Sequence, residues 1–311
     1  MSQPTPLVAV TGATGFIGTA LCQRLLAAGF AVRALARSEA RSRHLVAAGV
    51  EVVTGDLNDG ASLLRLLADS DYLVHAAGAV RGNSQQDFDR VNVAGTAAVL
   101  QALDAQARPP RLLLVSSLAA REPRLSWYAR SKAASEALVR ERTPEGLILR
   151  PPAVYGPGDR EMLPVFRAMA RGFAPVPGQV EARLSLVHVS DLTQAIVACL
   201  RSPRTSGQTL TLCDGKQAGY SWLELAAAAE QVFGRRVRLW RVPGVLLDAI
   251  AGSNSALAAI SGRAPMLTPP KLRELRHPDW VVDNDEITRL TGWTACVDLQ
   301  TGLEELRVEL R

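Results

Sequence analysis

Two side chains four residues apart, Tyr128 and Lys132 in the stretch SWYARSKAASEALV, are of the types that proton transfer requires. If this stretch is helical, both side chains lie on one face, because residues i and i+4 are neighbours on a helix. A tyrosine is a poor acid or base at neutral pH, and the positive charge of a nearby lysine stabilises the phenolate and lowers the tyrosine pKa. The pair predicts acid–base chemistry at the phenol oxygen. The alternative is an exposed helix face without chemistry.

A third polar side chain, Ser117, ends the strand-like run RLLLVSS. Its hydroxyl can donate a hydrogen bond to the same substrate oxygen that exchanges a proton with Tyr128. A Tyr-x-x-x-Lys pattern is common by chance. The catalytic interpretation therefore depends on a second site that binds the molecule on which these groups act.

Such a site is predicted near the N-terminus, where VTGATGFIG joins a strand-like run to an amphipathic one. Gly12 can adopt backbone angles that a side chain forbids, Gly15 lets the main chain approach a pyrophosphate, and Gly18 lets the helix pack closely on the sheet. The start of that helix offers free N–H groups and the positive end of its dipole. We predict a dinucleotide site. The alternative is a tight strand-to-helix turn that holds no ligand.

The end of the second strand indicates which dinucleotide is bound. VRALARSEARSR contains Arg37, Ser38, Arg41 and Arg43, and no acidic residue stands where a carboxylate would bond the ribose 2′-hydroxyl. An arginine pairs instead with a 2′-phosphate, so the sequence favours NADP(H) over NAD(H), unless these residues are only a solvated helix start. Asp56, after the third strand, can accept the adenine amino group or serve as a turn residue.

The elements that must position these residues alternate along the first half of the chain. Short apolar runs at 7–10, 31–36, 50–55, 72–77, 111–117 and 147–150 are separated by periodic stretches at 16–28, 40–48, 61–68, 87–106 and 127–142. This alternation predicts an α/β fold, a Rossmann-type doubly wound parallel sheet with its ligand crevice at the carboxyl ends of the strands.

Past Arg150 the alternation loosens into turns and helices, which predicts a smaller, mainly helical C-terminal substrate lobe. We expect residues 1–160, with 184–213 returning to them, to form the dinucleotide-binding domain. Residues 161–183 and 214–311 then form the substrate-binding lobe.

Composition excludes several other classes of protein. The 311 residues carry 35 basic and 30 acidic side chains without a dense basic patch, which argues against nucleic acid as a partner. The four cysteines are scattered, as in reduced cytoplasmic proteins, and no metal site is expected. The apolar segment VPGVLLDAIAGSNSALAAISG is interrupted by Pro, Gly, Ser and Asn, so no integral membrane segment is expected. It can still cover a lipophilic ligand or lie on a membrane surface.

Eight segments occur in a characteristic order: TGATGFIG, GDLND, HAAGAV, VNVAGT, LVSS, YARSK, RPPAVYGPGD and LVHVSDLTQAI. On these segments nearly the whole chain resembles the extended short-chain dehydrogenase/reductase family, also called the NAD-dependent epimerase/dehydratase family. Its apolar tail is similar to that of the branch of 3β-hydroxysteroid dehydrogenases and dihydroflavonol reductases.

The resemblance implies the site residues and an assembly. It implies catalytic roles for Ser117, Tyr128 and Lys132, with Asn92 organising waters behind the lysine, and structural roles for His188 and Asp191. A homodimer through the 87–106 and 127–142 helices is the habit of the family. The cofactor contacts that the resemblance implies are Gly12, Thr14, Gly15, Phe16, Ile17, Gly18, Arg37, Asp56, Leu57, Ala76, Ala77, Gly78, Tyr128, Lys132, Pro151 and Val154.

Three departures from the family pattern bear on the substrate. Ser117 and Tyr128 are closer in sequence than in the sugar-nucleotide epimerases, the loop between them begins SSLAARE, and Ala153 stands where those epimerases often carry an asparagine. We therefore expect a dehydrogenase/reductase that moves hydride between NADP(H) and a carbonyl or secondary alcohol of a small substrate, with a lipophilic substrate as one option. The alternatives are a nucleotide-sugar epimerase or dehydratase, and a non-catalytic NADP-binding sensor or assembly protein.

Overall fold

The computed structural model describes residues 5–261 and 267–310, and for residues 255–261 it describes the backbone alone. Residues 1–4, 262–266 and 311, which belong to the predicted N-terminal domain, apolar segment and substrate lobe, lie outside this part of the chain.

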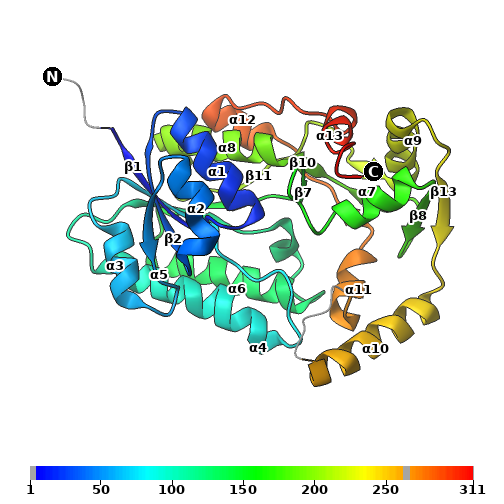
Figure 1. The fold of residues 1–311 in the computed structure, drawn as a ribbon, viewed down its shortest axis with the longest axis horizontal. Coiled ribbons are helices and arrows are strands. Elements are labelled where there is room, and N and C mark those ends of the chain that lie inside the picture. Colours follow the sequence, from blue (N-terminus) through cyan, green and yellow to red (C-terminus); the bar gives the residue numbers. More distant parts are fainter. Residues whose placement is uncertain (1–4, 262–266, 311) are drawn as a thin grey trace.

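A seven-stranded parallel sheet occupies one half of the molecule (Figure 1). The chain adds strands outward from β1 on one side and from β4 on the other, so its direction of winding changes between these two strands. This is a Rossmann-type doubly wound sheet, which confirms the predicted fold class and places a ligand crevice where β1 and β4 end. In spatial order the strands are β11 (Thr209–Thr211), β6 (Leu147–Arg150), β5 (Arg111–Val115), β4 (Tyr72–His75), β1 (Leu7–Thr11), β2 (Ala31–Ala36) and β3 (Glu51–Thr54).

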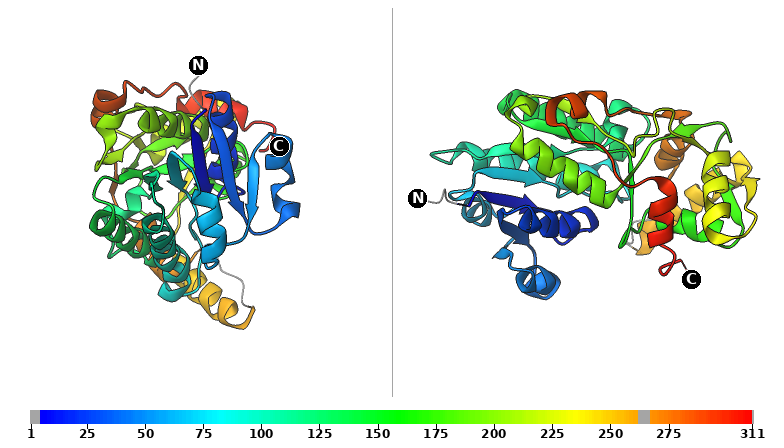
Figure 2. Two further views of the ribbon diagram at one scale, coloured as in Figure 1. Left: turned by 90° about the vertical axis from the view of Figure 1, so that its left-hand side faces the viewer. Right: turned by 90° about the horizontal axis from the view of Figure 1, so that it is seen from above.

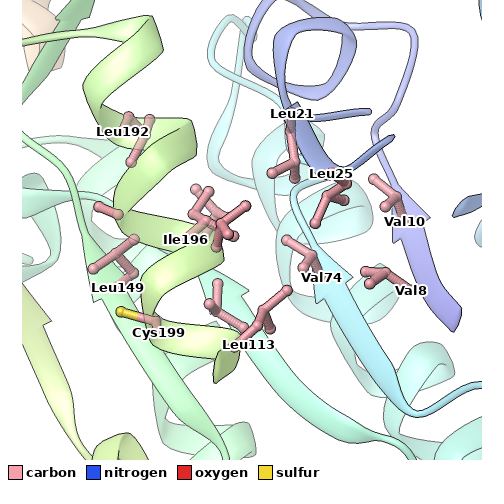
Figure 3. Close-up of a cluster of buried hydrophobic side chains, with 14 of the residues drawn as sticks. Val8, Val10, Leu21, Leu25, Val74, Leu113, Leu149, Leu192, Ile196 and Cys199 are labelled. Atoms are coloured by element: carbon pink, nitrogen blue, oxygen red, sulfur yellow. The ribbon is translucent and has the colours of Figure 1, made fainter. Parts of the chain in front are cut away.

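Helices cover both faces of the sheet, because successive residues of a strand point to opposite sides. Val8 and Val10 pack with one helical layer and Ala9 with the other. Figure 3 shows the first of these cores, in which side chains of α1 and α8 gather beside the valines of β1. The first layer consists of α1 (Phe16–Ala27), α2 (Glu39–Ala47), α8 (Val189–Arg201) and α12 (Asp285–Thr291), and the second of α3 (Gly60–Leu67), α5 (Ala94–Asp104) and α6 (Trp127–Arg142).

The single helix expected over 87–106 is divided in the structure. It consists of α4 (Gln85–Phe88), a π-helical turn over Asp89–Val93, and α5. A π turn inserts extra backbone into a helix and re-aims its side chains, and here it directs Asn92 into the interior. Periodicity did not show the division, because all three parts remain helical. The strands β3, β4 and β5 are shorter than predicted and end at Thr54, His75 and Val115. The last helix of the chain is α13 (Leu299–Glu305).

The second lobe lies beyond the carboxyl ends of the strands, as Figures 1 and 2 show. Its core contains Tyr155, Phe166 and Leu225, and a smaller cluster around Leu272 joins α10 to α11. The two-stranded sheet of β7 (Ala153–Tyr155) and β10 (Leu186–His188) contributes side chains to the cores of both parts. The other elements of the second lobe are α7 (Leu163–Ala170), β8 (Phe173–Val176), β9 (Arg183–Leu184), β12 (Tyr220–Ser221), α9 (Trp222–Phe233), β13 (Arg238–Arg241), α10 (Gly244–Ser261), α11 (Pro269–Leu275), β14 (Asp279–Trp280) and α13.

Most of the cysteines are buried, as expected. Cys22, Cys199 and Cys213 are buried and Cys296 is exposed, and all four are free. Within the described residues, no helix combines the length and the apolarity that crossing a membrane requires.

Candidate active site

The glycines of the β1–α1 turn lie where a side chain does not fit. Gly12 has a φ of +74°, and a Cβ there would lie 2.6 Å from the backbone nitrogen of Ala77 and 2.7 Å from the carbonyl carbon of Ala76. A Cβ on Gly18 would collide with the carbonyl oxygen of Gly12 and lie 2.7 Å from the Cα of Ala13. The turn is therefore pressed against the chain that leaves β4, at the point where the winding of the sheet changes direction.

The start of α1 is open to a ligand. Gly15 is the N-cap, no side chain caps the helix, and no acidic residue lies in its first turn. Thr14 is exposed, and Phe16 and Ile17 are half-buried at the same end of the helix. Uncapped amide groups at a helix N-terminus bind anions. The cradle formed by this turn fits the pyrophosphate of a dinucleotide.

The predicted adenosine contacts lie at the ends of β2 and β3. Arg37 is exposed just beyond β2. Its neighbour Ser38 caps α2 by accepting a hydrogen bond from the Arg41 amide, at 3.3 Å. Asp56 accepts a hydrogen bond from the Asn58 amide at 2.7 Å, so one carboxylate oxygen stabilises a turn. Leu57 packs against Gly95, where a Cβ would lie 2.6 Å from Leu57 Cδ1.

Helix α6 brings the predicted catalytic side chains to the crevice. Ser126 caps this helix and accepts a hydrogen bond from the Ala129 amide at 3.0 Å. One turn later, Lys132 is buried and its Nζ donates to the carbonyl oxygen of Val115 at 2.8 Å. A Cβ on Gly78 would lie 3.6 Å from that Nζ, so the chain after β4 passes directly beside the lysine. Tyr128 is half-buried, and its hydroxyl shares a hydrogen bond with Ser117.

The electrostatics of Tyr128 differ from the expectation. Burial raises the pKa of Tyr128 to about 12, the hydrogen bond with Ser117 lowers it, and the carboxylates of Glu274 and Glu161 raise it further. Burial also lowers the pKa of Lys132 to about 8, against the opposing influence of Glu136. The predicted lowering of the tyrosine pKa is thus wrong for this arrangement, because removal of the phenol from water raises the pKa, and the Lys132 ammonium group donates to Val115.

Ser117, Pro151 and Val154 lie together beyond the sheet. Ser117 caps the 3₁₀ turn Leu118–Arg121, with its Oγ accepting from the Ala119 amide at 3.2 Å. The Leu118 amide donates to the carbonyl oxygen of Pro151 at 2.8 Å, which ties this turn to the chain after β6. Val154, in β7, packs against the same core as α1 and α8. The residues predicted to border the nicotinamide are therefore connected to the one that hydrogen-bonds Tyr128.

Asn92 joins two parts of the site. Its Oδ1 accepts from the Ala79 amide at 2.7 Å, and its Nδ2 donates to the carbonyl oxygen of Ala79 at 3.1 Å and to Ser131 Oγ at 2.8 Å. Ser131 precedes Lys132 on α6. The side chain of Asn92 therefore fixes the loop after β4 against the helix that carries the tyrosine and the lysine.

Sequence reasoning missed a buried charge cluster behind α6. Glu136 is fully buried and accepts hydrogen bonds from Arg150 Nε at 2.8 Å, Arg150 Nη2 at 2.6 Å and Ser116 Oγ at 2.6 Å. Arg140 pairs with the same carboxylate at 2.9 Å. The cluster connects α6 to β6 and to the residue beside Ser117. The only feature of the sequence that indicated this cluster was the spacing of Lys132, Glu136 and Arg140, four residues apart on one helix.

A second missed group lies under the switch point. His75 is buried, and its Nδ1 and Nε2 lie 2.6 Å and 3.1 Å from the hydroxyl oxygens of Thr11 and Thr96. Burial, together with the charge of Lys132, lowers the pKa of His75 to about 3. A neutral imidazole thus connects the ends of β1 and β4 to α5.

Two residues of α11 complete the surroundings of Tyr128. Glu274 accepts a hydrogen bond from Ser126, the cap of α6, at 2.5 Å, and pairs with Lys271. The Nζ of Lys271 lies 5.6 Å from the centre of the Tyr128 ring. A small recess opens beside this ring, lined in part by Val80, Phe88, Thr268 and Pro270. No local pattern predicted these contacts, since Ser126 and Glu274 are 148 residues apart.

Replacement of Glu274 is expected to move the pH dependence of the reaction. Glu274→Gln removes a negative charge that raises the Tyr128 pKa, so that pKa falls. A reduction that requires the protonated phenol then declines from a lower pH than in the wild type. The measurement is kcat/KM against pH, with Glu145→Gln, an exposed residue of the opposite lobe, as the control. An unchanged profile in the Glu274 variant would contradict the assigned influence.

His188 and Asp191 have structural contacts, as the resemblance implies. His188 is buried at the start of α8, with its Nδ1 2.8 Å from Ser190 Oγ, and its ring packs edge-on against Tyr155. Asp191 accepts hydrogen bonds from the amides of Cys296 and Val297 at 3.0 Å and 2.9 Å.

Comparison with known proteins agrees with this geometry. The family model "NAD dependent epimerase/dehydratase family" matches residues 8–213. The chain is 39% identical over 275 residues to ceramide reductase of Caulobacter vibrioides, covering 88% of this chain and 85% of that protein. It is 29% identical over 325 residues to 4-hydroxy-2-methyl-3-oxo-4-farnesyl-3,4-dihydroquinoline-1-oxide ketoreductase of Stigmatella aurantiaca, covering 96% and 95%.

Among solved structures, the UDP-glucuronic acid 4-epimerase of Bacillus cereus in complex with UDP-glucuronic acid and NAD superposes with a TM-score of 0.72 at 21% identity, covering 98% of both chains. At this identity the similarity establishes the fold. With the family match over most of the chain and with reductases among its relatives, the protein is an oxidoreductase that belongs to the NAD-dependent epimerase/dehydratase family.

Proposed function

We propose that this protein reduces the ketone carbonyl of a lipophilic substrate with NADP(H) as its cofactor. The observation that carries the proposal is the hydrogen-bonded pair of Tyr128 and Ser117, with Lys132 one helical turn away at the switch point of the sheet. The two relatives described above are named for a ceramide and for a farnesyl-bearing quinoline oxide, and these names support a lipophilic substrate.

When bound, the reduced nicotinamide supplies a hydride to the carbonyl carbon. The hydroxyl of Tyr128 donates its proton to the carbonyl oxygen, and Ser117 donates a hydrogen bond to the same oxygen as negative charge develops there. Lys132, whose Nζ lies beside the chain after β4, would hold the cofactor ribose when the cofactor is bound. The glycine turn and the start of α1 would hold the pyrophosphate.

The raised pKa of Tyr128 favours reduction over oxidation. With a pKa near 12, the phenol is protonated at neutral pH and ready to act as an acid. Alcohol oxidation would require the phenolate, which burial disfavours. At neutral pH the phenol of Tyr128 is therefore in the form that can donate a proton.

We assign residues 1–160, with 184–213, to cofactor binding, and residues 161–183 and 214–311 to the substrate. The return of α8 and β11 to the sheet supports this division. The recess beside Tyr128, with one wall from the sheet domain and the other from α11, supports a substrate position between the two parts.

Arg37→Ala tests the preference for NADP(H). The exposed guanidinium at the end of β2 is positioned to bind a 2′-phosphate, and a lost charge-assisted interaction of about 1.5–3 kcal/mol corresponds to a rise of about tenfold to a hundredfold in KM. The expected result is this rise for NADPH with little change for NADH. Arg65→Ala, an exposed position on α3, is the control. Equal losses for both cofactors would exclude a contact between Arg37 and the 2′-phosphate.

The function itself is tested by following the absorbance of NADPH with a panel of compounds. The panel contains a keto-ceramide, a long-chain 3-keto ester, a short water-soluble ketone and a UDP-sugar. Consumption of NADPH with the long-chain ketones is the expected result. Conversion of the UDP-sugar without net NADPH consumption would instead identify an epimerase. Tight NADPH binding without turnover of any ketone would identify a binding protein.

A further inference from the structure

One end of the second lobe exposes an unusual number of large apolar side chains. Among the described residues, five of the large hydrophobic side chains that face solvent come from the ribbon of β8 and β13 and from α10, which follows it. Trp240 is 52% exposed and Val245 is 83% exposed. Such concentrations mark interaction surfaces. We call this set, with the exposed arginines beside it, the apolar–basic patch; its apolar members are Phe173, Trp240, Val245, Leu246 and Ile250.

The β8–β13 ribbon turns one face to the lobe and the other to solvent. Leu239 packs against the core of the lobe, so its neighbours Arg238 and Trp240 point the opposite way. In the parallel register Arg238 lies beside Phe173, and Trp240 lies beside Pro175. The outer face of the ribbon therefore combines two aromatic rings with a guanidinium group.

Helix α10 has two apolar sides. Leu247 and Ala251 are buried against Leu272 of α11. At about 3.6 residues per turn, Val245 falls nearly opposite these two residues and Ile250 falls on the flank of the helix, and both face solvent.

The orientation of α10 is held by Arg276, at the end of α11. Its Nη1 pairs with Asp248 at 3.0 Å, and its Nη2 donates to the carbonyl oxygen of Gly244 at 3.2 Å. These contacts fix the orientation of α10 relative to α11, so the apolar side of α10 that faces solvent is a fixed feature of the second lobe. Figure 1 shows α10 at the edge of the molecule, with α11 between it and the rest of the chain.

The charge around these side chains is positive. From residue 234 to residue 261 the sequence contains four arginines and one acidic residue, Asp248, which Arg276 already neutralises. All four arginines are exposed, and one of them, Arg235, donates to the carbonyl oxygen of Arg171. Exposed apolar side chains, a tryptophan and arginines in one segment of the chain are the combination that binds the interface of an anionic bilayer. The remaining members of the patch are Arg236 and Arg238, together with Arg241 at the end of β13, which is exposed but lies on the same side of the strand as Leu239.

We propose that the apolar–basic patch docks the protein onto the surface of a membrane containing anionic lipids. The inference rests on the proposed function, since it names the source of the lipophilic substrate. Helix α10 packs on α11, and α11 places Lys271 over the ring of Tyr128. The docking surface is therefore one helix away from the reacting phenol, so a lipid ketone leaves the bilayer next to the recess.

Binding is measured by sedimenting the full chain with vesicles. One set contains phosphatidylglycerol and phosphatidylcholine in equal parts, and the other contains phosphatidylcholine alone. The wild type is expected to bind the anionic vesicles, and added salt is expected to weaken that binding. The triple variant Arg236→Gln, Arg238→Gln, Arg241→Gln is expected to bind about a hundredfold more weakly. Its charge-matched control replaces the exposed Arg65, Arg204 and Arg307 with Gln.

The contribution of apolar side chains to vesicle binding is tested with a matched pair of substitutions. Val245 on α10 and Val308 near the C-terminus are each 83% exposed. Val245→Asp is expected to reduce vesicle binding at least tenfold, whereas Val308→Asp leaves it unchanged. Equal effects of the two substitutions would overturn the proposal. A change in oligomeric mass without loss of vesicle binding would identify a second copy of the chain as the occupant, and would also overturn it.

Activity separates docking from catalysis. In the triple variant, the rate on a keto lipid embedded in vesicles is expected to fall in proportion to binding, while the rate on a short water-soluble ketone stays unchanged. If the wild type does not bind anionic vesicles but reduces soluble ketones, the docking proposal is overturned and the proposed function stands. A wild type that binds these vesicles through the patch and reduces no ketone keeps the docking surface and overturns the proposed function.

Discussion

Tyr128→Phe is expected to reduce the turnover of a ketone by a factor of about 10² to 10⁴, the usual contribution of a positioned acid. The substitution removes one hydroxyl and leaves the ring in place. That ring packs at 6.2 Å from the ring of Phe88 and lies under Lys271, and neither contact requires the oxygen. Packing and cofactor affinity are therefore expected to change little.

The measurement combines initial rates with the dissociation constant of NADPH from a fluorescence titration. Tyr72→Phe is a matched control, because Tyr72 lies on β4 with its ring against Phe30, in the core of the sheet domain. The control is expected to retain its rate. An undiminished rate in Tyr128→Phe would remove the tyrosine from the mechanism. A loss of rate accompanied by an equal loss of NADPH affinity would assign it to cofactor binding instead.

Arg150→Met is expected to lower the free energy of unfolding by about 3–5 kcal/mol, the usual cost of leaving a buried charge without its partner. Arg150 provides two of the hydrogen bonds to the fully buried carboxylate of Glu136. Arg140→Met is the control, since Arg140 pairs with the same carboxylate but is half exposed, and it is expected to cost less than about 1 kcal/mol. Urea denaturation gives both values.

The Glu136 cluster also gives the stability a pH dependence with a definite sign. Burial acts to raise the pKa of Glu136, but hydrogen bonds from Arg150 and Ser116 and the charges of Arg150 and Arg140 lower it below its ordinary value. A carboxyl group with a lowered folded-state pKa binds fewer protons in the folded state. Its contribution is therefore present above its ordinary pKa and is lost as the pH falls through the folded-state value.

Arg150→Met is expected to weaken this acid-side loss, and the double variant Glu136→Leu, Arg150→Met to recover part of the lost stability. If Arg150→Met were as stable as the wild type, the stabilising role of the Glu136 cluster would be contradicted.

The sheet domain could be predicted from the sequence because its signals are local. The pattern VTGATGFIG predicts the conformation of the turn, since a side chain at Gly12 or Gly18 would collide with the backbone. Tyr128 and Lys132 share a helix face by their spacing alone. The π turn at Asn92 could not be predicted in this way, because its sequence pattern remains helical and the contacts of Asn92 with Ala79 and Ser131 lie outside its own helix.

Among the residues around Tyr128, those that are distant in sequence could not be predicted either. Lys271 and Glu274 reach the start of α6 through the packing of α11, and nothing near residue 128 in the sequence refers to them. The direction of the Tyr128 pKa followed from burial, which is a sum over neighbours from every part of the chain. The pairing of Glu136 with Arg150 likewise depends on α6 lying against β6.

By itself, the sequence determined which atoms are available for chemistry and the order in which strands and helices present them, since both depend on residues within a few positions of one another. The tertiary structure decided the protonation of Tyr128, the neighbours that surround it and the apolar surface left uncovered on α10. These properties depend on desolvation and on contacts between distant segments, and both exist only after the chain has packed.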